Sequence, residues 1–290
     1  MPNFEDQDNA AYVRRVHDKG LQFDVRTMSR RRLLGVLGGA GALAALAACG
    51  TTEASTTTAT AAASTGTPAE VESETAGPYP ADGTNGPDVR TLDGIVRRDI
   101  RSSFGDASGT AEGVLLDFSL VVQDLSGRRV TGAAVYAWHC NRDGEYSLYS
   151  TNVADQNYLR GIQVADDSGT VTFTSIFPAC YDGRWPHIHF EVYGSLENAT
   201  SGDGPIVKTS QIAVPEATAK EVYATDGYSA SIANLSKVTL AEDNVFGDDS
   251  AATELATVTG SVSDGYQATL TIAIDPSGEE EGGGGAPPAN

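Results

Sequence analysis

Apolar and polar residues alternate with a period of two over much of the middle of the chain. Successive side chains of a β-strand point to opposite faces, so this alternation predicts strands with one apolar face. Helical periodicity is scarce, and turn residues separate the runs. The runs that we expect to form strands are 116–122, 134–139, 170–176, 187–193, 206–214 and 266–274. Short strands of this kind predict a mainly β fold, an antiparallel β-sandwich with long loops.

The two ends of the chain lack this pattern. Residues 51 to about 73 are mostly Thr, Ala and Ser, and the last residues include three consecutive glutamates and four glycines. Such compositions cannot bury enough apolar area to offset the entropy lost on ordering. We therefore expect disordered tails on both sides of one folded domain: a leader at 1–48, a flexible tether at 49–73, the domain at 74–275, and a disordered tail at 276–290.

The leader resembles an export signal. Paired arginines at 30 and 31 precede an uncharged run rich in Gly, Ala and Leu from Leu33 to Ala48, too short for a comfortable membrane-spanning helix. This arrangement resembles a twin-arginine signal, and Met28 is then a plausible true initiator. Small residues before Cys49 resemble the motif at which lipoprotein signals are cleaved, so Cys49 is expected to carry lipid. The expected location is the outer face of the bacterial cytoplasmic membrane, with the lipid at Cys49 as the only membrane contact.

The charge balance limits the partners. Nineteen Lys and Arg stand against 39 Asp and Glu, a formal net charge of −20. This charge repels phosphate backbones, so nucleic acid is not expected as a partner. Acidity otherwise indicates only a well-solvated surface.

Two histidines stand out in the expected strand 187–193. His187 and His189 alternate with Ile188, Phe190 and Val192, so both imidazoles share one face while the apolar residues occupy the other. Two ligands at this spacing can converge on one metal. Paired histidines also occur as ordinary hydrogen-bonded residues or as zinc ligands, but metal binding is the favoured interpretation.

The motifs around these histidines, taken together, resemble those of the intradiol ring-cleavage dioxygenases, the family of catechol 1,2-dioxygenase and protocatechuate 3,4-dioxygenase, and most closely its secreted members. The resemblance spans nearly the whole domain and rests on a series of short motifs in family order. These motifs are Glu74 to Tyr79, Arg98 to Arg101, Gly132 to Val135, Trp138 to Cys140, Gly144 to Ser147, Leu159 to Gly161, Pro178 to Tyr181, Arg184 to Phe190, and Thr209 to Ile212.

The resemblance implies that one Fe(III) is held by Tyr146, Tyr181, His187 and His189. Ferric iron favours anionic oxygen, and coordination can deprotonate a phenol whose free pKa is about 10. The implied reaction joins O2 to a catechol-type aromatic and opens the ring between its two hydroxyls to give a muconate-type diacid. One of the two tyrosinates is expected to leave the iron and accept a proton, and Tyr181 is also a candidate catalytic residue.

Two further residues match catalytic positions of the family. Arg184 matches the arginine that stabilises negative charge on the substrate ring, and Gln211 matches its polar companion. His139 lies outside the ligand motif and is expected to be a hydrogen-bonded core residue.

The sequence departs from the family's pattern in its cysteines and in the segment before the domain. If Cys49 is lipidated, Cys140 and Cys180 form an even pair in an oxidising compartment, and we expect a disulfide between them. The polar tether stands where catechol 1,2-dioxygenases have a helical dimerisation domain, so that mode of dimerisation is not expected.

Two other hypotheses remain open from the sequence. One is a non-catalytic exported β-sandwich that binds a ligand or protein and keeps only a relict metal site. The other is a zinc or copper enzyme built on His187 and His189.

Overall fold

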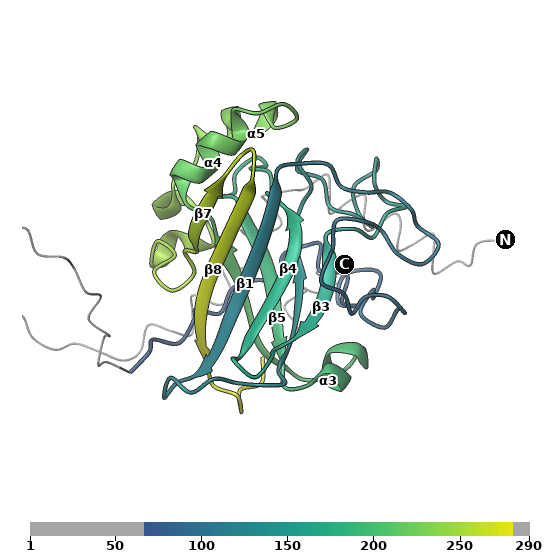
Figure 1. The fold of residues 1–290 in the computed structure, drawn as a ribbon, viewed down its shortest axis with the longest axis vertical. Helices are drawn as coiled ribbons and strands as arrows, with labels where there is room; N and C mark the ends of the chain where they lie inside the picture. The colour runs from purple at the N-terminus through teal and green to yellow at the C-terminus, as the bar shows by residue number, and fades with distance from the viewer. Residues whose placement is uncertain (1–66, 281–290) are drawn as a thin grey trace, which may run out of the picture.

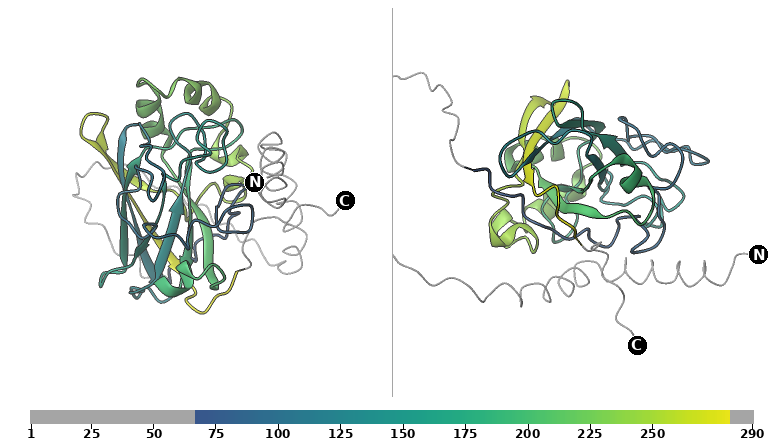
Figure 2. Two further views of the ribbon diagram at one scale, coloured as in Figure 1. Left: turned by 90° about the vertical axis from the view of Figure 1, so that its right-hand side faces the viewer. Right: turned by 90° about the horizontal axis from the view of Figure 1, so that it is seen from below.

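The computed structural model describes residues 67–280, which form two four-stranded sheets packed face to face (Figure 1, and in side view in Figure 2). The first sheet has the strand order β4-β1-β8-β7, and the second has the order β3-β2-β5-β6. The predicted β-sandwich is therefore confirmed. The strands are β1 (Leu115–Asp124), β2 (Ala134–Trp138), β3 (Arg160–Val164), β4 (Thr170–Ile176), β5 (His187–Tyr193), β6 (Ile206–Ala213), β7 (Thr257–Ser261) and β8 (Gly265–Ile274).

One strand pair departs from the antiparallel arrangement that the sequence predicted. β1 and β8 run parallel, with Leu116 opposite Tyr266 and Asp124 opposite Ile274. Parallel neighbours need a long crossover connection. Here the chain between the two strands forms β4, β7 and the whole second sheet, so the first and last strands of the domain meet at the centre of the first sheet.

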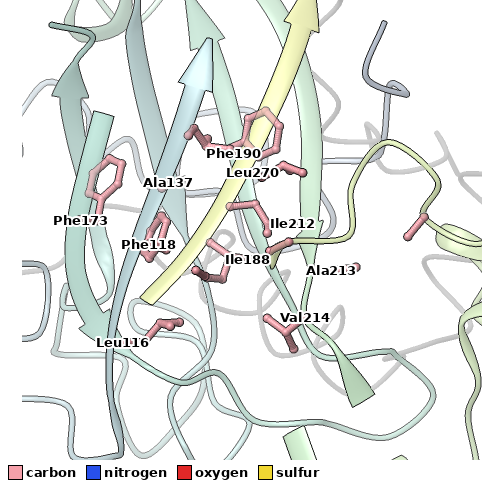
Figure 3. Packing of buried hydrophobic residues seen from close by; sticks show 14 of the residues in the cluster. Leu116, Phe118, Ala137, Phe173, Ile188, Phe190, Ile212, Ala213, Val214 and Leu270 are labelled. Atoms are coloured by element: carbon pink, nitrogen blue, oxygen red, sulfur yellow. The ribbon is translucent and has the colours of Figure 1, made fainter. Parts of the chain in front are cut away.

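The alternating residues of β1 fill the space between the sheets (Figure 3). Leu116, Phe118, Leu120 and Val122 are all at most 1% exposed. The ring of Phe118 stacks on Phe173 of β4 with ring centroids 5.0 Å apart. The second sheet contributes apolar residues of the same period to this core, including Ile188, Phe190 and Ile212.

The opposite face of the second sheet is also buried. Every residue of β2 and β5 is buried. A second apolar cluster packs Tyr136 and Trp138 of β2 against Ala76, Ala81 and Val89 from the irregular segment before β1. The N-terminal part of the domain therefore covers the face of β5 that carries His187 and His189.

The folded unit extends further at both ends than we predicted. Val71 is 2% exposed, and its N–H donates to the carbonyl of Ala273 over 2.9 Å. The N–H of Glu280 donates to the carbonyl of Ile206 over 2.7 Å. Residues 67–73 and 276–280 are thus part of the domain, because their backbones find partners at sheet edges that composition alone does not reveal. The predicted leader and Cys49 lie outside the described residues, as does most of the predicted tether. Within residues 67–280, no helix is long and apolar enough to cross a membrane.

Short helices not predicted from the sequence occupy the long connections. α4 buries Ala219, Val222 and Tyr223 near one end of the sandwich, where Figure 1 also shows α5. Helices this short give little periodic signal in a sequence. Their bounds are α3 (Leu196–Thr200), α4 (Glu216–Tyr223), α5 (Ser229–Leu235), and the 3₁₀ turns η1 (Leu240–Glu242) and η2 (Phe246–Asp248).

The core packing generates a stability prediction. Phe118→Ala removes a ring that is 1% exposed and stacked on Phe173. We expect a loss of about 3–5 kcal/mol in the free energy of unfolding, measured by urea denaturation, because the transfer free energy is lost and a cavity remains. Leu115→Ala on the same strand is the control, since Leu115 is 38% exposed and its loss should cost less than about 1 kcal/mol. Equal losses for the two variants would contradict this description of the core.

Candidate active site

His187 and His189 project from one face of β5, as their spacing predicted, and their rings meet. The two Nε2 atoms lie 3.1 Å apart, and each residue is 2% exposed. Nδ1 of His187 lies 2.5 Å from the carbonyl oxygen of Trp185, so that nitrogen carries the proton and Nε2 keeps its lone pair. Trp138 of β2 stacks on the ring of His189 with centroids 5.0 Å apart and an interplanar angle of 2°. Both imidazoles are therefore held in fixed orientations.

Tyr146 and Tyr181 reach the same point from two loops. Tyr181, between β4 and β5, has its hydroxyl 3.2 Å from Nε2 of His187. Tyr146, in the segment after β2, has its ring centroid 6.0 Å from that of Tyr181 and 6.2 Å from that of His189. The structure thus brings together all four residues that the family resemblance implied as ligands.

Burial controls the charge state of this cluster. It holds the pKa of His187 well below the usual value, helped by the nearby Arg184 guanidinium. Burial also holds the pKa of His189 well below the usual value, with His187 as the next cause. The pKa of Tyr146 is raised well above the usual value by burial and then by Tyr181. Without a cation, all three side chains are neutral, and the histidines offer lone pairs.

The four donors fit a ferric ion. Within residues 67–280, the buried hydroxyl of Tyr146, which faces Tyr181, has no hydrogen-bond partner at normal geometry, an arrangement that costs free energy unless another group completes it. Two imidazole nitrogens and two phenol oxygens are a suitable donor set for a hard trivalent cation, which would favour the phenolate forms. Among residues 67–280, no three or more His, Cys, Asp or Glu side chains form a group that could hold a metal ion.

Two glycines permit the close approach of loops to the ligands. Gly144 has φ +84°, and a Cβ there would lie 3.2 Å from Cβ of Tyr181. Gly77 has φ +67°, and a Cβ there would lie 3.2 Å from Cε1 of His189. Side chains rarely adopt this backbone conformation, so a larger residue at either position would strain the backbone as well as displace a candidate ligand.

Arg160 on β3 ties the Tyr146 loop to the rest of the domain. Its Nε donates to Oγ of Ser147 over 3.1 Å, and its Nη2 donates to the Ser147 carbonyl over 3.0 Å. Its Nη1 donates to the carbonyl of Pro80 and to the hydroxyl of Tyr136, over 3.0 and 3.2 Å. Arg160 is 1% exposed, and no carboxylate within the described ranges forms a salt bridge with it. The sequence pointed to Arg160 only as part of a family motif, without a role.

Arg184 and Gln211 lie together beside the cluster, as the resemblance implied. Nη2 of Arg184 donates to Oε1 of Gln211 over 2.7 Å. Nε2 of Gln211 donates to the carbonyl of Thr75 over 2.9 Å. Gln211 faces His189 across the β5–β6 pairing, which fixes its place near the histidines. Both Arg184 and Gln211 are at most 1% exposed.

One residue at this site was missed by sequence reasoning. Asp243 forms a buried ion pair with Arg184, with Oδ2 3.1 Å from Nε. It lies 59 positions along the chain from its partner, in the segment between η1 and η2, and no periodicity or motif marks it.

The predicted disulfide is not formed in the structure, where Cys140 and Cys180 are buried free thiols. The Cys140 thiol points to the carbonyl of Ala179 at 3.6 Å, whereas the Cys180 thiol points to that of Arg184 at 3.3 Å. Burial raises the pKa of each thiol to about 12, so neither is a ready thiolate nucleophile.

His139 is the hydrogen-bonded core residue that we predicted. Its Nδ1 and Nε2 contact the carbonyl of Cys140 and Oγ of Ser175, each over 2.7 Å. Burial lowers its pKa to about 4. The neutral ring is therefore satisfied within the core.

The Arg160 contacts generate a second stability prediction. Lysine cannot reproduce the planar fork of donors, so Arg160→Lys should leave buried acceptors unpaired and lower the free energy of unfolding by at least about 2 kcal/mol. The control is Arg101→Lys, whose exposed pair with Asp99 should be worth about 0.5 kcal/mol or less. Equal urea midpoints for Arg160→Lys and the parent protein would contradict the importance of this network.

Comparison with known proteins finds relatives in sequence and in fold. A family model described as Dioxygenase matches residues 85–199. Chlorocatechol 1,2-dioxygenase of Rhodococcus opacus is 42% identical over 65 residues, which cover 22% of this chain and 25% of that protein. Catechol 1,2-dioxygenase of Pseudomonas sp. (strain EST1001) is 37% identical over 60 residues, covering 21% of this chain and 20% of that protein. The aligned region therefore spans a quarter or less of the length of these relatives.

The fold comparison extends over most of the described domain. The solved intradiol ring-cleavage dioxygenase from Tetranychus urticae has a TM-score of 0.58 and 24% sequence identity, and the match covers 73% of this chain and 98% of that chain. All four candidate ligands and Arg184 lie within the matched residues 85–199. The sequence comparison therefore makes this chain similar to dioxygenases over residues 85–199, and the structural match shows that it shares the fold of a solved intradiol ring-cleavage dioxygenase.

Proposed function

We propose that this protein is a non-haem Fe(III) dioxygenase that opens the ring of a catechol-type aromatic between its two hydroxyls, using O2 and giving a muconate-type diacid. The observation that carries the proposal is the meeting of Tyr146, Tyr181, His187 and His189 at one buried point, beside Arg184. The relatives with aligned segments are named for 1,2-cleavage of catechol and chlorocatechol.

The four clustered side chains would hold the iron. When bound, Fe(III) supplies a strong positive charge that favours phenolate and catecholate oxygens over their protonated forms. The two histidines are suited to this task because burial keeps them neutral, with their lone pairs available.

Tyr181 is the better candidate for the ligand that moves. It is partly exposed, whereas Tyr146 is 1% exposed and enclosed by other aromatic rings. A phenolate oxygen on Tyr181 can take a proton from an incoming catechol hydroxyl and turn away, because solvent can receive its hydroxyl. Tyr146 stays in place because its burial leaves no solvated position to which its hydroxyl could turn.

Arg184 would act on the substrate ring. Its guanidinium lies beside the histidines and lowers the pKa of both through its positive charge. The same charge stabilises negative charge that develops on a ring carbon when the catecholate reacts, and a contribution of about 2–4 kcal/mol is typical of such a group. Gln211 would hold the guanidinium in place through its 2.7 Å hydrogen bond.

We also propose that the enzyme is exported and held by lipid at Cys49 to the outer face of the bacterial cytoplasmic membrane. The support is the sequence pattern of paired arginines, uncharged run and small residues before that cysteine.

Substitutions three residues apart separate metal binding from charge stabilisation. His187→Ala should lose iron, visible colour and activity together, because one of four ligands is gone. Arg184→Ala should keep iron and colour but turn over catechol roughly tenfold to a thousandfold more slowly, because only transition-state stabilisation is lost. Iron content, the visible spectrum and O2 uptake measure these three properties.

For each expected outcome, a specific result would contradict the proposal. Stoichiometric iron in His187→Ala, or normal turnover in Arg184→Ala, would overturn the site assignment. A product cleaved outside the two hydroxyls would overturn the reaction class. Arg101→Ala is the matched control for a lost arginine, because its pair with Asp99 is exposed.

The anchor has its own test. Cys49→Ala removes the thiol that would carry lipid, so the expressed protein should move from the membrane fraction to the soluble fraction on ultracentrifugation. Cys140→Ala keeps Cys49 and should still sediment with membranes. A Cys49→Ala protein that partitions fully with membranes would refute lipid anchoring at this residue.

A further inference from the structure

We propose that Asp243 is a positioning residue that holds the Arg184 guanidinium in the orientation needed for catalysis. This inference rests on the proposed function, because it assigns to Asp243 a role that acts only through Arg184.

The Asp243 carboxylate is oriented by backbone groups as well as by its ion pair. Its Oδ1 accepts hydrogen bonds from the N–H groups of Val245 and Phe246, over 2.8 and 3.0 Å. Its Oδ2 accepts one from the N–H of Trp185 over 2.6 Å. Asp243 is 2% exposed, so these contacts are made in a region of low dielectric where each is strong. The carboxylate therefore has a fixed direction relative to the start of β5.

The guanidinium is held at two of its nitrogens by different parts of the chain. Nε lies 3.1 Å from Oδ2 of Asp243, while Nη2 donates to Oε1 of Gln211 over 2.7 Å. The ring of Phe246, three residues after Asp243, lies with its centroid 5.9 Å from Cζ of Arg184. A free arginine side chain has many rotamers, and fixing a planar group at two edges removes most of them before substrate arrives.

The Arg184–Asp243 ion pair also reduces the free-energy cost of burying the guanidinium charge. Arg184 and Asp243 have side chains that are 1% and 0% exposed, and a buried charge is costly unless it is paired and hydrogen-bonded. The hydrogen bond from the Trp185 N–H further links Asp243 to the residue whose carbonyl contacts Nδ1 of His187. Asp243 is therefore connected to both the charge-stabilising arginine and one candidate ligand, without contacting the reacting atoms itself.

The test is Asp243→Asn in the iron-loaded enzyme. Asparagine has nearly the same shape but lacks the charge, and it cannot accept with both side-chain atoms. We expect kcat for catechol to fall about 10- to 100-fold with KM changed less than threefold, because misplacing a catalytic group has this size of effect. Iron content and the visible spectrum should stay as in the parent, and so should the affinity for 4-nitrocatechol, measured by spectral titration under anaerobic conditions.

A double-mutant cycle distinguishes positioning from general damage. If Asp243 acts through Arg184, the Arg184→Ala/Asp243→Asn protein should be no slower than Arg184→Ala alone. Independent, multiplicative losses would overturn the proposal, as would a normal kcat in Asp243→Asn. Asp99→Asn, which breaks an exposed pair with Arg101, is the control and should have the parent kcat.

A second variant covers the case in which Asp243→Asn does not fold. Asp243→Glu keeps the charge but moves the carboxylate by one methylene, so it should retain iron and colour and still lose kcat; a parent-like kcat would overturn the proposal. A parent protein that contains iron but consumes no O2 with any catechol would instead refute the proposed function. Loss of iron from Asp243→Asn and Asp243→Glu would show that Asp243 serves metal binding rather than Arg184, and would also overturn the inference.

Discussion

The site depends on the alternation of side chains along β5, which serves the core and the chemistry with the same seven residues. Ile188, Phe190 and Val192 enter the core between the sheets, while His187 and His189 face the opposite side. Because the apolar residues are locked by packing, the histidines cannot rotate or shift without disturbing the sandwich. The precision of the candidate metal site is therefore a by-product of core packing. A strand with one solvated face could not provide it, since burial on both faces is also what keeps the histidines neutral.

Around this strand, loops and single buried polar residues complete the arrangement. The Tyr146 loop is tied down by Arg160, and the Arg184 side chain is held by Gln211 and Asp243. These contacts join segments that are far apart in the chain. Each one satisfies buried donors or acceptors that would otherwise have no hydrogen-bond partner. Function in this fold thus rests on loops whose positions are set by a few polar contacts to a rigid sandwich.

Sequence alone predicted the features that depend on local pattern. Period-two alternation located six of the strands, and the spacing of His187 and His189 placed both imidazoles on one face. The family resemblance supplied Tyr146 and Tyr181, which the structure brings to the histidines. Contacts between distant segments were not predictable: the partner of Arg184, the role of Arg160 and the parallel pairing of β1 with β8 leave no periodic trace. The short helices were not predicted because one or two turns give too little periodic signal in the sequence. The disulfide prediction was wrong because the number of cysteines does not determine the direction in which each thiol points.

The pairing of β1 with β8 has a consequence for how the chain must acquire its structure. Leu116 and Tyr266 are neighbours in the sheet although 150 positions separate them, so β1 lacks its parallel partner until nearly the whole domain has been synthesised. Contacts of this range close large loops and make folding slow. Until β8 has been synthesised, the edge of β1 that later pairs with β8 is exposed to other chains. The first sheet can therefore be completed only after β8 has been synthesised, and before that point aggregation and chaperone binding compete with formation of the native state.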